Sequence, residues 1–239
     1  LVSILYFKDN FLNLITSSKD NLNNTYSIEY ENSSFYGNLK VVGVRSDKSN
    51  SISSYKLYQN GFTQNTIDKD GNSLNSYTYI LDALSQLTTP ENALVLGLGG
   101  GIIPTKLYNK GYDVDVVEID PSTLKIAKNF FQFKKRNMNF FFEDARTFSK
   151  SCPRKYNLII IDLFFADGIP EHLTTVEFYR DLRNCLNKKG VIVSNSVGDF
   201  SNSNTLNSVL FTFNAIFKDV YYFYDKPYIQ QSPIKVTNL

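Results

Sequence analysis

The stretch ALVLGLGGGIIPTKL, residues 93–107, constrains the fold more than any other part of the chain. Three glycines at alternate positions, Gly97, Gly99 and Gly101, separate an apolar run from a segment that can form a helix. Residues without a Cβ let the backbone bend sharply and approach a ligand closely, as they do in nucleotide-binding α/β folds. The stretch therefore predicts a strand–turn–helix unit with a nucleoside at the turn.

The remaining sequence divides into two regions of different character. Before residue 76, polar and apolar residues alternate, and Asn60-Gly61 between two such runs predicts a β-hairpin. From residue 93 onward, mostly apolar segments alternate with helical ones, as in a parallel sheet covered on both faces. The predicted strands are 93–97, 113–119, 138–143, 156–162 and 190–196.

Helix signals complete this outline. Apolar residues at three- and four-residue spacing predict a helix at 76–87, and Asp120-Pro121 provides the start of another. Further helices are expected at 174–186, with Val176, Tyr179, Leu182 and Leu186 on one face, and at 206–217, before a strand at 220–224. We predict an N-terminal extension at 1–25, a small antiparallel β-domain at 26–75, and a doubly wound, mostly parallel Rossmann-like sheet at 76–239.

Composition excludes several classes of function. The 25 basic and 23 acidic side chains are scattered and give a net charge of +2, so no nucleic-acid surface is expected. The spacing of Cys152 and Cys185 suggests neither a zinc site nor a disulfide framework, and one histidine, His172, excludes a His-rich metal site. We therefore expect no metal and a reducing, cytoplasmic compartment. No apolar run is long enough to span a bilayer, although a chain that begins at Leu1 can be part of a longer membrane protein.

The glycine pattern favours one class of ligand. A dinucleotide fingerprint would place its third glycine at position 102, where Ile102 stands, so the chain carries G-x-G-x-G, the form associated with adenosyl-sulfonium compounds. Glu118 ends the next predicted strand, where a carboxylate can accept hydrogen bonds from ribose hydroxyls. Asp144 follows the third strand and can accept the adenine amine, or simply cap the next helix. Together they predict S-adenosylmethionine or a close derivative.

A further carboxylate, Asp162, follows the apolar strand that ends at Ile161, where a charge is costly unless it is solvated or used. The order G-x-G-x-G, EID, EDA and an apolar strand ending in aspartate resembles the polyamine aminopropyltransferase family, the spermidine and spermine synthases. DLFFADGIPEHLTTVEFYRDLRNCLNKKGVIVSN is similar to a spermidine-synthase-like branch, some members of which are fused to a membrane transporter-like segment. The resemblance covers residues 26–197.

The resemblance implies transfer of an aminopropyl group from decarboxylated S-adenosylmethionine to an amine, without a metal. Asp162 matches the catalytic aspartate and Tyr77 the tyrosine that positions the amine. Glu118 matches the ribose-binding acid and Asp144 the adenine-binding acid, and Gln64 is a weaker candidate for contacting the nucleoside. It also implies a homodimer and, through an upstream segment, a membrane tether.

Departures from the family pattern leave alternatives open. Gly100 stands where spermidine-forming members have an aspartate that holds the aminopropyl tail, and Phe165 replaces a second aspartate of the catalytic loop. Asp167 can substitute for that aspartate or simply solvate the loop, and His172 is expected to fix the loop by a hydrogen bond. A methyltransferase that uses S-adenosylmethionine itself, and a non-catalytic module that binds methylthioadenosine or a polyamine, are the alternative functions.

Overall fold

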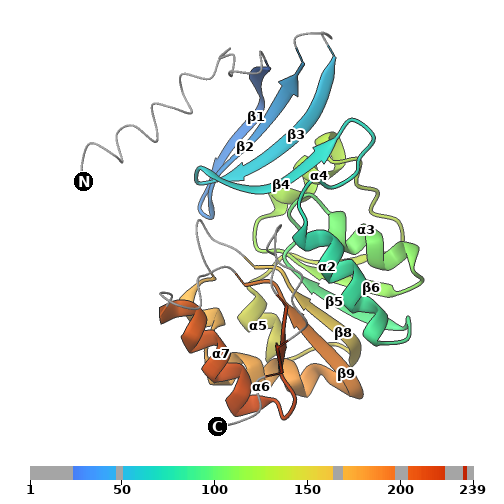
Figure 1. Cartoon of the computed structure of the whole chain (residues 1–239), viewed down its shortest axis with the longest axis vertical. Coiled ribbons are helices and arrows are strands. Elements are labelled where there is room, and N and C mark those ends of the chain that lie inside the picture. The colour runs from blue at the N-terminus through green and yellow to red at the C-terminus, as the bar shows by residue number, and fades with distance from the viewer. Residues whose placement is uncertain (1–23, 47–50, 164–168, 197–203, 224–233, 236–239) are drawn as a thin grey trace.

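A computed structural model describes residues 24–46, 51–163, 169–196, 204–223 and 234–235. Figure 1 shows an N-terminal sheet at one end of the molecule and a larger α/β unit at the other. The predicted extension at 1–25 lies almost wholly outside the described residues, and so do Phe165 and Asp167.

The N-terminal sheet is an antiparallel meander in the order β1-β2-β3-β4. Its strands are β1 Thr25–Ser34, β2 Gly37–Arg45, β3 Ile52–Gln59 and β4 Phe62–Asp68. Asn60 and Gly61 join β3 to β4 with φ of 50° and 86°. Two consecutive positive φ values match the right-handed twist of the flanking strands, so the predicted hairpin is confirmed.

The larger sheet has the order β7-β6-β5-β8-β9, and all its strand pairs are parallel. Its strands are β5 Asn92–Leu96, β6 Asp113–Val117, β7 Asn139–Phe141, β8 Tyr156–Ile161 and β9 Leu186–Ser194. The helices are α2 Tyr77–Leu84, followed by the 3-10 turn η1 Ser85–Leu87, then α3 Ile102–Asn109, α4 Pro121–Phe130, α5 Ala145–Ser149, η2 Glu171–Leu173, α6 Val176–Cys185 and α7 Asn204–Ile216. The doubly wound parallel sheet is confirmed.

Alternate residues of the central strands feed two separate cores, because successive side chains of a strand point to opposite faces. Val95 of β5 and Ile160 of β8 pack in the core under α2, α3 and α4. Leu96 and Ile161 pack in the core that α5 and α6 cover, with α7 against it. Figure 1 shows these helices on the two sides of the sheet. Burial on both faces explains why the strands read as continuous apolar runs.

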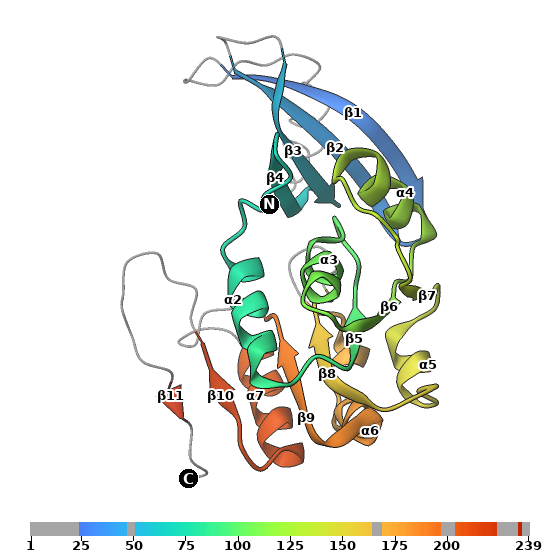
Figure 2. The same cartoon turned by 90° about the vertical axis from the view of Figure 1, so that its right-hand side faces the viewer.

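A third core joins the two sheets. Leu39, Leu57 and Ile67 of the N-terminal sheet pack against Ile126 of α4 and Phe131 just beyond its end. Figure 2 shows α4 directly beneath the sheet. The hydroxyl of Ser34, the last residue of β1, also donates to the Asp120 carboxylate at 2.6 Å, while the other Asp120 oxygen caps α4 through the N–H of Ser122.

Two sequence expectations fail near the C-terminal half. Leu186 begins β9 instead of ending α6, so it does not share a helix face with Val176, Tyr179 and Leu182. Cys152 and Cys185 form a disulfide with Cα atoms 5.8 Å apart, so the expectation of no disulfide is wrong. A separation of 33 residues gives no pairing signal; only packing of the segment after α5 against the end of α6 brings the sulfurs together.

The strand expected at 220–224 is the short β10 Tyr221–Tyr222, which pairs with β11 Ile234–Lys235.

Among the described residues, no helix is long and apolar enough to cross a membrane. Within the same part of the chain, no group of three or more histidines, cysteines or carboxylates is arranged to hold a metal ion.

A buried ion pair links β6 to the amino-terminal ends of β7 and β8. Asp115 of β6 is 1% exposed, and its carboxylate accepts hydrogen bonds from Arg154, from the Tyr156 hydroxyl at 2.8 Å and from the Asn139 amide at 2.8 Å. Arg154 Nη2 lies 2.7 Å from the carboxylate. The neighbours of this buried charge thus satisfy both of its oxygens.

We predict that Arg154→Met lowers the free energy of unfolding by about 2–4 kcal/mol, because it leaves Asp115 buried without a cation. Denaturant unfolding measures the change. The matched control is Lys69→Met, which breaks the exposed Lys69–Asp70 pair and should leave stability unchanged. Equal effects of the two variants would contradict the structural role of Asp115.

Candidate active site

The candidate site lies where the chain order of the parallel strands reverses, between β5 and β8. Helices leave such neighbouring strands toward opposite faces, which opens a crevice at their carboxyl ends. The N–H of Asp162 donates to the carbonyl of Leu96 at 2.9 Å, so the end of β8 lies directly beside the end of β5. A Cβ on Gly97 would lie 2.2 Å from the Asp162 carbonyl oxygen, and Gly97 has a φ of 94°. Glycine is therefore required at 97 for this contact.

The glycine turn makes most of its hydrogen bonds within the protein. The N–H of Gly97 donates to Val117 and that of Gly101 to Leu98, both at 2.8 Å, and the N–H of Gly100 donates to the Asn65 side chain at 2.5 Å. These three N–H groups are therefore not free to bind a ligand. The turn instead supplies a close approach: a Cβ on Gly99 would lie 2.3 Å from Asn65 Oδ1. Gly101 caps α3 with a φ of 75°, faces Phe133, and does not line the cleft.

Gly100 stands beside the ring of Phe131. A Cβ there would lie 2.7 Å from that ring. Phe131 belongs to the core that joins the two sheets, so the ring is held in place from both sides. An aspartate, which the related spermidine-forming enzymes are expected to carry at this position, would require that core to shift.

Glu118 holds the glycine turn against the end of β6. One of its carboxylate oxygens accepts the N–H of Leu98 at 3.0 Å and the other accepts the N–H of Asp120 at 2.9 Å. Burial raises the pKa of the Glu118 carboxyl, and these backbone donors oppose the rise. Each oxygen keeps a second lone pair, so the side chain can still accept hydrogen bonds from ribose hydroxyls, the role predicted for it.

Asp144 serves two partners at once. Its Oδ1 caps α5 by accepting the N–H groups of Arg146 and Thr147 at 3.0 and 3.1 Å, and its Oδ2 lies 3.2 Å from His172 Nε2. Asp144 thus caps the helix, one of the two roles considered from the sequence, and it also lines the cleft, where the other role would place it. His172, on η2, links the loop after β8 to α5, as expected, and Arg146 supports it through the His172 carbonyl at 3.1 Å.

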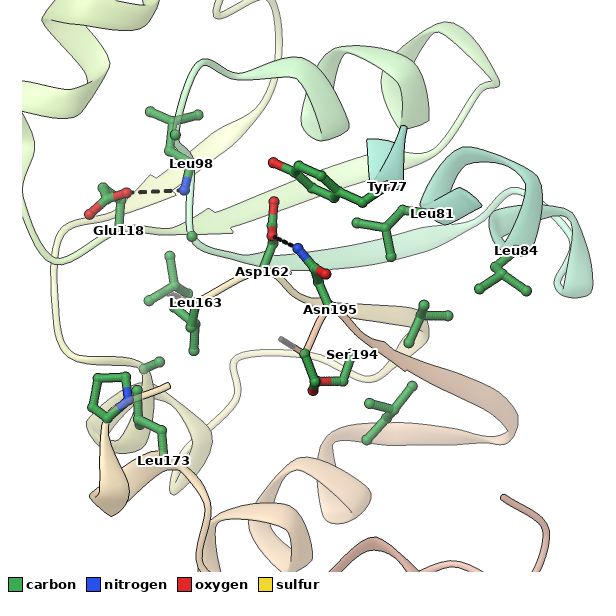
Figure 3. Close-up of a pocket in the computed structure, with 18 of the residues that line it drawn as sticks. Tyr77, Leu81, Leu84, Leu98, Glu118, Asp162, Leu163, Leu173, Ser194 and Asn195 are labelled. Atoms are coloured by element: carbon green, nitrogen blue, oxygen red, sulfur yellow. Dashed lines mark hydrogen bonds between the residues drawn. The ribbon is translucent and has the colours of Figure 1, made fainter. Parts of the chain in front are cut away.

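Asp162 is the carboxylate best placed to exchange a proton. Its Oδ1 accepts a hydrogen bond from the Asn195 amide at 2.9 Å (Figure 3). Burial raises the pKa of Asp162 to about 6, although Asn195 and Tyr77 oppose the rise by hydrogen bonding to the charged form. A base with such a pKa is ionised at neutral pH and still holds a proton better than an ordinary aspartate does.

Tyr77 and the middle of β4 line the cleft beside Asp162. Figure 3 shows the Tyr77 ring above the carboxylate. Burial and the negative charge of Asp162 raise the pKa of the Tyr77 hydroxyl, so it stays protonated as a donor. The Asn65 amide donates to this hydroxyl at 2.8 Å while its oxygen accepts the N–H of Gly100. Gln64, the neighbour of Asn65, lines the same cleft.

The fold thus gathers most of the predicted residues around one cleft. Tyr77, Gly97, Gly99, Glu118, Asp144, Asp162 and Gln64 all line it. Sequence reasoning missed Asn65 and Asn195. A single asparagine in a strand or after one carries no signal of its own, and only the pairing of β8 with β9 and the packing of β4 on the glycine turn reveal their roles. Apolar wall residues, Ile119, Leu163, Pro170 and Leu173, suit an adenine ring between the two acids.

We predict that Asp162→Asn stabilises the protein at pH 8. Folding raises the pKa of this carboxyl, so its protonated form stabilises the folded state. This stabilisation is complete below the ordinary pKa of about 3.9, and it is lost as pH rises through the pKa in the folded protein, about 6. A neutral amide does not ionise, so Asp162→Asn should raise the free energy of unfolding by about 1–3 kcal/mol at pH 8, and this increase should fade between pH 6 and pH 4. Thermal unfolding at several pH values measures it. Asp70→Asn, at an exposed carboxylate, is the control, and a loss of stability for Asp162→Asn at pH 8 would contradict the assignment.

We also predict that Asn65→Ala lowers the free energy of unfolding by about 1–3 kcal/mol, since the buried N–H of Gly100 loses its acceptor. A double-mutant cycle with Tyr77→Phe should give a coupling of about 0.5–1.5 kcal/mol between the two side chains. Asn109→Ala, at an exposed position on α3, is the control and should change stability by less than about 0.5 kcal/mol. Additive effects of Asn65→Ala and Tyr77→Phe would argue against the bridge.

Comparison with known proteins agrees with this geometry. Residues 75–228 match the spermine/spermidine synthase domain family. A polyamine aminopropyltransferase of Vibrio vulnificus (strain CMCP6) is 36% identical over 141 residues, which cover 56% of this chain and 46% of the relative. An N-terminal histidine N-methyltransferase of Emericella nidulans is 38% identical over 132 residues, which cover 53% of this chain and 23% of that protein. The chain thus spans about half the length of the Vibrio relative.

The structure is similar to solved structures of the same family. The crystal structure of a probable spermidine synthase from Corynebacterium glutamicum superimposes with a TM-score of 0.68 at 21% identity, covering 81% of this chain and 72% of that one. The matched residues 75–228 include the glycine turn, Glu118, Asp144 and Asp162. The chain belongs to the spermine/spermidine synthase family.

Proposed function

We propose that the chain transfers an aminopropyl group from decarboxylated S-adenosylmethionine to an amine. The observation that carries the proposal is the Asp162 carboxylate, whose pKa burial raises to about 6 beside the glycine turn and under Tyr77. An alkylammonium has a pKa near that of lysine, about 10.4, so it reaches the site protonated and cannot attack. A buried carboxylate at the sheet edge can hold this cation and accept its proton.

The chemistry balances without another reactant. The neutral amine nitrogen forms a bond to the aminopropyl carbon attached to sulfur, and the carbon–sulfur bond breaks with both electrons going to the sulfonium. The products are methylthioadenosine and an amine extended by one aminopropyl group. Asp162 takes up the proton, Tyr77 and Asn195 hold the carboxylate in place, and the cleft releases the proton to solvent afterwards.

Charge in the cleft favours the decarboxylated donor. At the carboxyl ends of β5 to β8, the acidic side chains that the structure describes in the cleft wall are Glu118, Glu143, Asp144 and Asp162. The decarboxylated donor carries two positive charges, a sulfonium and an ammonium, and no carboxylate. Such an acidic wall attracts it more strongly than it attracts S-adenosylmethionine, whose carboxylate finds no lysine or arginine among these described wall residues.

One observation favours a second function, methyl transfer from S-adenosylmethionine. Gly100 removes the side chain that would oppose a methionine carboxylate, and the Emericella relative is named as an N-methyltransferase. An amine methyltransferase would need the same base, so Asp162 does not distinguish the two functions. They are distinguished by the donor used, either decarboxylated S-adenosylmethionine or S-adenosylmethionine itself.

We predict that the purified chain, given decarboxylated S-adenosylmethionine and an amine, releases methylthioadenosine, which chromatography measures. Asp162→Asn should lower kcat by about 10²–10⁴ while methylthioadenosine still binds, because the variant loses the base and keeps the nucleoside site. In the native chain, kcat/KM should rise with pH through about 6 as Asp162 ionises. Asp70→Asn, an exposed carboxylate on the β4–α2 connection, is the control and should react as the native chain does.

Other outcomes would replace this function. A methylated amine formed from S-adenosylmethionine, with no reaction of the decarboxylated donor, would establish the methyltransferase. Tight binding of methylthioadenosine with no turnover of either donor, unchanged by Asp162→Asn, would establish a binding module.

A further inference from the structure

The cleft has two arms that meet at Asp162. Figure 3 shows Leu98 and Glu118 on one side of this carboxylate and Leu81 and Leu84 on the other. The first arm carries the acids expected to hold the nucleoside. The second, the apolar arm, runs between α2 with its η1 turn and β9. Its walls are formed by Ile80, Leu81, Leu84, Leu87, Val191 and Val193.

The sequence of α2 builds one wall of the apolar arm. Tyr77, Leu81 and Leu84 recur at spacings of four and three residues, so they lie along one face of the helix. Tyr77 faces Asp162 at one end, and a rise of 1.5 Å per residue puts Leu84 about 10 Å further along the helix. Leu81 and Val193 are 3% and 7% exposed and form a closed floor, while Leu87, 63% exposed, stands at the open end.

Charge is absent from the apolar arm where a diamine would need it. Among the described residues of α2, η1 and the carboxyl half of β9 that line the cleft, none is acidic, and the polar ones nearest Asp162 are Ser194 and Asn195. A second ammonium would lose its hydration among these leucines and valines with no described carboxylate beside it, which opposes its binding.

We infer that the acceptor is a primary amine whose other end is an apolar alkyl chain, with the nitrogen at Asp162 and the chain along the apolar arm. This inference rests on the proposed function and names its acceptor class. Asp162, the carboxylate that the described residues place where the two arms meet, pairs with the one cation, and the alkyl chain covers leucine and valine side chains that line the cleft. Burial of apolar surface then supplies the affinity that a second ion pair would supply for a diamine.

The test uses a matched pair of amines, n-pentylamine and 1,4-diaminobutane, which differ by a methyl group in place of one ammonium. Calorimetry on the 239-residue chain loaded with methylthioadenosine measures binding of each amine, and product analysis with decarboxylated S-adenosylmethionine measures kcat/KM. We expect n-pentylamine to exceed 1,4-diaminobutane at least tenfold in both. From n-propylamine to n-hexylamine, affinity should rise about threefold for each added methylene.

Variants place a carboxylate in the apolar arm. Leu84→Asp should reverse the preference toward the diamine. Leu87→Asp, at an exposed position that the fold tolerates, should shift the preference in the same direction for longer diamines even where Leu84→Asp fails to fold. The matched control is Leu74→Asp: Leu74 is 59% exposed and is not part of the cleft wall, so the native preference should persist.

The outcomes separate this inference from the proposed function. Preference for 1,4-diaminobutane with formation of methylthioadenosine would overturn the apolar acceptor and leave the transferase in place. Selective binding of n-pentylamine without aminopropyl transfer would overturn the transferase and leave the apolar arm in place. Failure of the loaded protein to bind n-pentylamine at millimolar concentration would overturn the inference directly.

Discussion

The contact between the ends of β5 and β8 is the constraint on which the site depends. The Leu96 carbonyl accepts the N–H of Asp162, and Gly97 passes so close to the Asp162 carbonyl that no side chain fits between them. This contact sets the glycine turn and the buried carboxylate side by side at the point where helices diverge to opposite faces of the sheet. Every other functional side chain is placed relative to it.

A chain of hydrogen bonds carries this arrangement into the N-terminal sheet. Asn195, just after β9, holds Asp162, Tyr77 covers it from α2, and Asn65 in the middle of β4 joins the Tyr77 hydroxyl to the N–H of Gly100. The small sheet is thus part of the candidate active site. Phe131 and the Ser34–Asp120 hydrogen bond fasten it to α4 and fix the position of Asn65.

The chemistry has a thermodynamic cost. Burial gives Asp162 the raised pKa that the proposed reaction uses, and a buried carboxylate that ionises at neutral pH opposes folding. The buried carboxylate of Asp115 differs, because Arg154, Tyr156 and Asn139 all donate hydrogen bonds to it. Of these two buried aspartates in one sheet, Asp115 has a cationic partner and Asp162 has only neutral hydrogen-bond donors.

The sequence by itself determined the alternation of strands and helices, the Asn60-Gly61 hairpin and the order of acids along the chain. These are local properties: continuous apolar runs, glycine spacing and a carboxylate after each strand follow from periodicity and backbone sterics. It predicted five of the seven described cleft-lining candidates for the same reason, since parallel strands place their carboxyl ends at one edge; Tyr77 and Gln64 came from resemblance alone. Gly101 was assigned to the ligand and instead caps α3.

Only the tertiary structure decided which partners meet. Asn65 contacts Gly100 across 35 positions of the chain, Asn195 contacts Asp162 across 33, and Cys152 pairs with Cys185 across 33. No periodic pattern encodes such pairs, because each depends on how two separately formed elements pack. The apolar arm of the cleft is of the same kind: the leucines of α2 read as core residues in the sequence, and only the position of β9 opposite them leaves part of that face open to a ligand.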